Sequence, residues 1–136
     1  MSSGAPPEAT RVFFTDRHIG HKVAAELRAQ GEAVVRHDDV FPQDAPDEAW
    51  LLRVGREGWV AITCDTRIRR HPAERRALVE SGALVFVVTA RRLTGQQMAE
   101  LIGAALPAMR MIAATATRPA IYTLGSNGKP TLLGIE

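Results

Sequence analysis

Two aspartates stand directly after apolar runs that predict buried strands. Asp16 follows the run RVFFT at positions 11–15, and Asp65 follows WVAITC at positions 59–64. In an open parallel sheet, ligands bind beyond the carboxyl ends of the strands, so both side chains are expected at the same edge. Two carboxylates at short range repel each other unless a cation lies between them. The expected cofactor is therefore Mg²⁺ (or Mn²⁺), a hard ion that prefers oxygen ligands.

A third acid is expected from the predicted helix 47–57. Asp47 and Glu48 open this helix, which follows the second predicted strand and so begins at the carboxyl end of the sheet. We expect Asp16, Asp47 and Asp65 to converge as catalytic metal ligands, with Glu48 as a further ligand. The alternative is that the two helix-start acids only complement the helix dipole, a contribution of about 0.3–1 kcal/mol.

Arginine is concentrated just after Asp65. Of the seventeen Lys and Arg residues of the chain, only Lys22 and Lys129 are lysines. The cluster consists of Arg67, Arg69, Arg70, Arg75 and Arg76. A planar guanidinium binds phosphate oxygens with two hydrogen bonds, so this cluster is typical of a nucleic-acid contact, although a solvated helix face remains the other interpretation. The expected substrate-binding residues are Arg17, His18, Arg67, Arg69 and Arg70.

Strand-like and helix-like patterns alternate along most of the chain. Strands are expected at 11–15, 33–36, 59–64 and 84–88. Helices are expected at 19–30, 47–57 and 73–81. This order predicts an α/β fold with a mostly parallel central sheet of about four strands and helices on both faces.

The connections and the C-terminal part follow other patterns. The Asp- and Pro-rich stretch 37–46 predicts a loop, in which Asp44 or Asp47 could cap the next helix. Thr94 is expected to cap a helix that runs to about Leu106, with a second helical segment at 109–116. Asn127-Gly128 accepts the positive φ angles of a tight turn and predicts a β-hairpin at about 120–135.

The composition is typical of a small cytoplasmic domain. Residues 11–136 are expected to form one domain, preceded by a flexible tail at 1–10 that lacks the features of a signal peptide. The longest apolar stretches, such as 98–106, are far shorter than the ~20 residues of a membrane span, so no membrane partner is expected. The single cysteine, Cys64, cannot form an internal disulfide, which suits a reducing compartment.

The order of these motifs resembles the PIN-like domains, in particular the small VapC-toxin-related and DUF5615-related branch. The resemblance rests on FFTD, then PDEAWLLRVGREGWVAITCD, then TRIRRHPAERRAL, and it spans about residues 11 to 88. It implies a three-layer sandwich with ligands at Asp16, Asp47 and Asp65. It also implies metal-dependent hydrolysis of RNA, commonly by the toxin of a toxin–antitoxin pair. The implied partners are RNA and a cognate antitoxin protein, and a homodimer is a further expectation.

Departures from the family pattern leave other interpretations open. Many PIN toxins have a fourth acid, and the candidates here are Glu48, Asp38, Asp39 and, as a weaker one, Glu74. A PIN-like fold that only binds RNA or a protein partner is one alternative function. A phosphoacceptor receiver domain is another, although it requires a lysine after a late strand and the chain offers only Lys129, in a turn. The sequence does not decide between one and two metal ions.

Overall fold

The computed structural model describes residues 11–135, so the tail predicted at 1–10 lies outside the described residues. Its centre is a six-stranded sheet with the order β2-β1-β3-β4-β5-β6. The strands are β1 (Val12–Thr15), β2 (Ala33–Arg36), β3 (Val60–Thr63), β4 (Leu84–Val88), β5 (Ala120–Leu124) and β6 (Pro130–Leu133). The first five are parallel to their neighbours, and β6 is antiparallel to β5. The predicted mostly parallel α/β sheet is confirmed.

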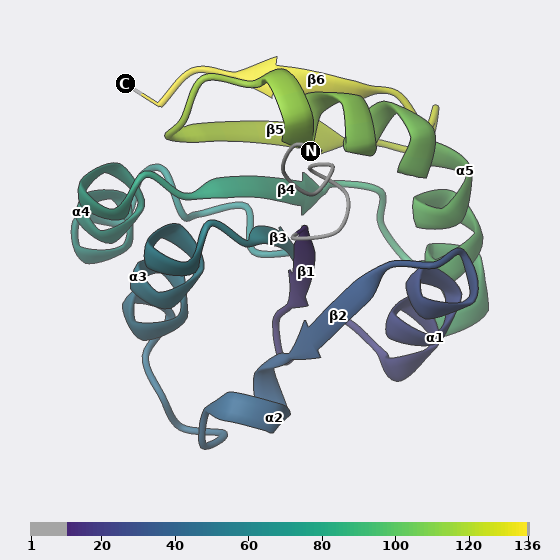
Figure 1. Ribbon diagram of the computed structural model, residues 1–136, viewed down its shortest axis with the longest axis horizontal. Coiled ribbons are helices and arrows are strands. Elements are labelled where there is room, and N and C mark those ends of the chain that lie inside the picture. Colours follow the sequence, from purple (N-terminus) through teal and green to yellow (C-terminus); the bar gives the residue numbers. More distant parts are fainter. Residues whose placement is uncertain (1–10, 136) are drawn as a thin grey trace, which may run out of the picture.

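Helices cover both faces of the sheet (Figure 1). They are α1 (His21–Ala29), α2 (His37–Val40), α3 (Asp47–Glu57), α4 (Pro72–Ser81) and α5 (Gly95–Thr115). α1 and α5 lie together on one face, and α3 and α4 lie on the other. The architecture is therefore a three-layer sandwich.

Successive residues of each central strand face opposite layers, as the pleat of a strand requires. Phe13 and Ile62 pack in the cluster that contains the buried residues of α1 and α5. Phe14 and Ala61 pack with Trp50 and the other buried residues of α3 and α4. All four residues of β3 are buried. Because both layers are packed, the carboxyl ends of β1 and β3 are held in a fixed register.

The structure differs from the sequence-based expectation in the connection 37–46. This stretch contains the one-turn helix α2, which begins at His37. The carboxylate of Asp39, its third residue, accepts a hydrogen bond from the backbone N–H of Arg36 at 2.8 Å. Neither Asp44 nor Asp47 caps α3, since the N-cap residue is Pro46 and Asp47 is the first helical residue. An Asp- and Pro-rich composition does not exclude a single helical turn, and here local side-chain hydrogen bonds stabilise one.

α5 is one continuous helix, and the two segments predicted there are wrong. Pro107 lies inside it and has no N–H to donate to the carbonyl of Gly103. The side-chain amide of Gln30 donates to that carbonyl instead, at 3.3 Å, which offsets the lost bond. The helix is long and apolar enough to cross a membrane, with a mean hydropathy of 1.2. Its inner face packs in the core through residues such as Ile102 and Leu106, so it is a core helix.

The predicted β-hairpin is confirmed, and it extends the central sheet. β5 pairs in parallel with β4, from Leu84↔Ala120 to Val88↔Leu124. In the turn Gly128 has a φ of 75°, as predicted, whereas Asn127 does not adopt a positive φ. The sheet therefore has six strands, five of them parallel, where the sequence predicts a sheet of about four with a separate hairpin.

A buried carboxylate connects the start of β1 to α5. The side chain of Glu32 is 3% exposed, and it accepts hydrogen bonds from Arg11 at 2.9 and 2.6 Å and from Arg110 at 2.6 Å. Burial raises the pKa of Glu32, but the hydrogen bonds from the two guanidinium groups outweigh it, so that the pKa lies below its ordinary value of 4.5.

This arrangement predicts the pH dependence of stability. A carboxyl group whose folded pKa is depressed stabilises the fold above its unfolded pKa, and this contribution is lost as the pH falls through the folded pKa. We expect Glu32→Gln to lower the free energy of unfolding at pH 7 by about 1.5–3 kcal/mol, the range for hydrogen bonds to a charged group. The difference from wild type should shrink below pH 4.5. Urea denaturation across this range measures it, with the exposed Glu100→Gln as the control. A constant difference at all pH values would contradict the assignment.

Candidate metal centre

The carboxyl ends of β1 and β3 lie side by side at the centre of the sheet. The strands pair from Phe13↔Val60 to Thr15↔Ile62. The register continues one residue further, because the N–H of Asp16 donates to the carbonyl of Ile62 at 3.2 Å. Since β2 lies on the other side of β1, the strand order reverses here, and this is where open α/β sheets bind ligands.

Three carboxylates from different elements converge at this edge. They belong to Asp47, the first residue of α3, to Asp65, two residues beyond β3, and to Glu74, in the first turn of α4. One oxygen from each lies within 4.8 Å of the others. The structure thus brings together two of the acids expected from the sequence, and Glu74, the weakest of the expected candidates, joins them.

The surroundings of Glu74 disfavour the ionised form of its side chain. Burial raises its pKa above the ordinary value of 4.5, and the neighbouring Asp47 and Asp65 raise it further. Its Oε1 is buried and has no hydrogen-bond partner among residues 11–135, whereas Oε2 lies 3.4 Å from Nδ1 of His71. A buried carboxylate oxygen without a partner is costly. A divalent cation between the three groups would supply the missing partner and cancel the repulsion, so the residues present fit a hard metal ion.

Asp65 is held in its ionised form. Burial raises its pKa, but hydrogen bonds from Arg67 outweigh this effect and the pKa lies below its ordinary value of 3.8. The backbone N–H of Arg67 donates to Oδ1 at 2.9 Å, and its Nε donates to the same atom at 3.2 Å. The backbone N–H of Asp65 donates to the hydroxyl of Thr63 at 3.1 Å. These contacts orient the carboxylate toward the group.

Asp16 lies beside the group and is not one of its three members. It is 4% exposed, and its Oδ1 accepts the backbone N–H of His18 at 2.9 Å. Its Oδ2 accepts the hydroxyl of the buried Thr63. Burial raises the pKa of Asp16 above its ordinary value, more than these hydrogen bonds lower it. Thr63 thus connects Asp16 to the backbone of Asp65, a link that the sequence did not reveal.

Arg17 and Trp50 orient Asp47. Arg17 Nη2 lies 3.3 Å from Asp47 Oδ1, and Trp50 Nε1 donates to the same oxygen at 3.1 Å. Arg17 also donates to the carbonyl of Ala45 at 3.0 Å. The side chain predicted to bind substrate is therefore engaged with a member of the acidic group. Glu48, the next residue of α3, lies outside the group.

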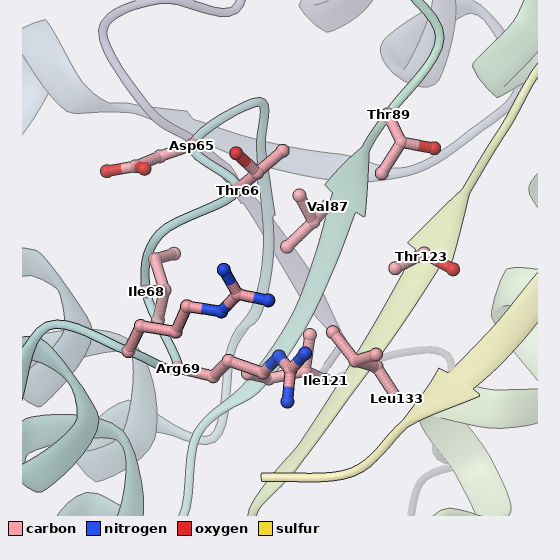
Figure 2. Close-up of a pocket in the computed structure, with 10 residues that line it drawn as sticks. Asp65, Thr66, Ile68, Arg69, Val87, Thr89, Ile121, Thr123 and Leu133 are labelled. Carbon is pink, nitrogen blue, oxygen red and sulfur yellow. The ribbon is translucent and has the colours of Figure 1, made fainter.

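The acidic group opens into a cleft of ≈ 310 Å³. Its lining residues are Arg17, His18, Asp47, Cys64, Asp65, Thr66 and Arg67. His18 is exposed there, and the side chain of Arg67 is 81% exposed although it contacts Asp65. Arg69 and Arg70 line an adjoining pocket (Figure 2). Of the five predicted substrate contacts, His18, Arg67 and Arg70 are exposed, Arg69 is half-buried, and Arg17 contacts Asp47.

The membership of Glu74 could have been given more weight from the sequence. Pro72 is favoured at the first position of a helix, and it places Glu74 at the third. A metal site is better indicated by an acid in the first turn of each of two helices, next to a strand that an acid follows, than by the adjacent pair Asp47 and Glu48. The sequence does not show how far the connection between β3 and α4 brings the two helix starts together.

Two comparisons with known proteins found a match. Residues 11–90 match the family model described as "PIN like domain". A protein of Mycobacterium tuberculosis, described as "Putative ribonuclease VapC45", is 30% identical over 117 residues, which cover 82% of this chain and 84% of that protein. No solved structure matches.

Proposed function

The chain belongs to the PIN-like domain family, and on that premise we propose that it is a Mg²⁺- or Mn²⁺-dependent endoribonuclease. The observation that carries the proposal is the convergence of Asp47, Asp65 and Glu74 around a buried Glu74 oxygen that no group in the described part of the chain hydrogen-bonds. A protein that only bound RNA would gain nothing from three carboxylates that repel the phosphates of its ligand. The similarity to a protein described as a ribonuclease supports the same activity.

Each acid has a distinct part in the proposed site. Asp47, Asp65 and Glu74 hold the metal, which when bound lowers the pKa of a water and polarises the scissile phosphate. Asp16 accepts the hydroxyl of Thr63, whose oxygen accepts the backbone N–H of Asp65, so Asp16 positions the backbone that follows β3. The sequence predicts Asp16 as a direct ligand. In the structure both of its oxygens already accept hydrogen bonds from the protein, which favours a positioning part.

The cationic side chains around the cleft are proposed to bind the RNA backbone. Arg67 projects from the loop beyond Asp65 with its side chain 81% exposed, and His18 is an exposed residue of the same cleft lining. Arg70 extends this surface toward α4, where Arg75 and Arg76 lie. Neutralising phosphates with arginines releases counterions, so RNA affinity should fall steeply with salt.

We further propose that the enzyme is the cytoplasmic toxin of a toxin–antitoxin pair. The proposed partners are RNA, a cognate antitoxin protein and a second copy of the chain. The support is the similarity to a protein that carries a VapC name. This part of the proposal depends on the ribonuclease activity.

The direct test is incubation of the purified protein with total RNA in Mg²⁺ or Mn²⁺, with and without EDTA. We expect cleavage that EDTA stops and that added Mn²⁺ restores, because the carboxylate group requires a cation. Cleavage that persists in excess EDTA would contradict a metal-dependent mechanism. RNA binding without cleavage in either metal would favour the binding-module alternative.

A further inference from the structure

A second pocket adjoins the acidic group on the face of the sheet that carries α3 and α4. It lies between the loop after β3 and the strands β4, β5 and β6, as Figure 2 shows. Its lining residues are Asp65, Thr66, Ile68, Arg69, Arg70, Val87, Thr89, Ile121, Thr123 and Leu133. Asp65 and Thr66 also line the acidic cleft, so the two hollows share one wall. A group bound in this pocket would lie next to a phosphate bound at Asp47, Asp65 and Glu74.

The interior of the pocket is apolar and its rim is polar. Ile68, Val87 and Ile121 are each at most 4% exposed and form a rigid part of the core. Thr66, Thr89 and Thr123 line the pocket beside them. In Figure 2 the hydroxyls of Thr89 and Thr123 point away from Val87, and each donates to a backbone carbonyl at 3.4 Å. The polar groups at the rim are the side chains of Arg69 and Arg70. An apolar interior with charged groups at its rim suits a flat ring that carries polar edges.

The size and charge of the pocket restrict its occupant. Its volume is ≈ 120 Å³, well below the ~300–1,000 Å³ of sites for drug-sized ligands. One ring system fits, whereas a peptide segment does not. Arg69 and Arg70 lie at the same opening and supply positive charge for a phosphate linked to that ring. A site for one ring with positive charge for a phosphate beside it fits a single nucleotide.

We propose that this pocket binds the base of the RNA nucleotide next to the scissile phosphate and thereby sets the base preference of cleavage. The inference rests on the proposed ribonuclease function and assigns a subsite to it. The family match ends at residue 90, whereas Ile121, Thr123 and Leu133 come from the hairpin beyond it. The C-terminal hairpin therefore contributes to substrate selection in addition to completing the sheet.

The first test measures nucleotide binding without catalysis. In metal-free buffer, ¹⁵N–¹H NMR titrations compare the four ribonucleoside 5′-monophosphates with ribose 5-phosphate. We expect the nucleotides, and not ribose 5-phosphate, to shift the amide signals of Thr89, Thr123 and Leu133. Thr123→Trp fills the pocket and should weaken this binding by at least about 10-fold, because the indole takes the space in which the base would be buried. Leu132→Trp is the control, because Leu132 is 63% exposed and lies on the opposite face of β6.

A second variant and a second readout keep the test decisive. Thr89→Trp fills the same pocket from an exposed position, so it serves if Thr123→Trp fails to fold. Sequencing of the cleavage sites should show that either variant loses the base preference at one flanking position while still cutting RNA. Equal shifts with ribose 5-phosphate, or an unchanged preference in both variants, would overturn the base pocket and leave the ribonuclease proposal intact. Nucleotide binding by a protein that cuts no RNA would support the pocket and refute the enzyme.

Discussion

Replacement of Asp65 by asparagine is expected to reduce RNA cleavage by at least about 100-fold. Loss of one outer-shell partner can already cost a metal site ~10–100-fold, and Asp65 is proposed as a direct ligand. Asp65 also lines both the acidic cleft and the adjoining pocket. The fold should survive, because Asp65 lies beyond the end of β3 and outside the apolar core. Without metal, the variant should be somewhat less stable than wild type at neutral pH, because the ionised carboxylate accepts two hydrogen bonds from Arg67 and its pKa is depressed.

The matched control is Glu48→Gln. Glu48 stands next to Asp47 on α3 but lies outside the converging group, so its loss should reduce cleavage far less. Initial rates on a labelled RNA, measured at several Mn²⁺ concentrations, compare the two variants. If Asp65→Asn cuts at the wild-type rate, the assignment of the site fails. If Glu48→Gln loses as much activity as Asp65→Asn, the sequence-based expectation of a direct Glu48 ligand is supported.

The second large effect concerns living cells. Expression of the wild-type chain alone in a bacterium is expected to stop growth, and expression of Asp65→Asn at the same level is not. A nuclease turns over, so a few copies damage many RNA molecules, whereas a binding protein acts only in proportion to its abundance. The variant keeps Arg67, Arg69 and Arg70, so its RNA-binding surface is preserved.

Growth curves after induction, with immunoblots for matched expression, measure this effect. Equal growth inhibition by wild type and Asp65→Asn would show that binding rather than cleavage is responsible. If neither protein slows growth and the purified wild type still cuts RNA, the enzyme proposal stands and the toxin proposal falls.

Much of the fold could be predicted because its elements obey local patterns. β3 is buried on both faces and reads as a continuous apolar run, and α3 has its predicted bounds because Gly58 can adopt a φ of 72° at its end. The sequence predicts two helical segments where the structure has α5, which contains Pro107, a residue that normally interrupts a helix. The compensating donor, Gln30, is distant in sequence, and only the packing of α1 against α5 brings it there.

The sequence predicts at which strand and helix ends the acids of the candidate site lie, but not how their side chains are oriented. Asp47 and Asp65 meet because parallel topology places their elements at one edge of the sheet. The orientation of Asp16 was not predictable, because it depends on the hydroxyl of Thr63 on the neighbouring strand. The pocket beside Asp65 was not predictable either, since it requires β5 to pair with β4 and thereby place Thr123 near the loop after β3.

The central claim is that Asp47, Asp65 and Glu74 together bind a divalent metal ion, and isothermal titration of Mn²⁺ into the purified protein tests it most directly. We predict saturable binding to the wild type and a loss of at least about 10-fold in affinity for Glu74→Gln, because Glu74 supplies the buried oxygen that has no other partner. Glu80→Gln, an exposed position on the same helix, should bind as the wild type does. Absence of binding to the wild type, or equal affinity in Glu74→Gln, would contradict the metal centre described here.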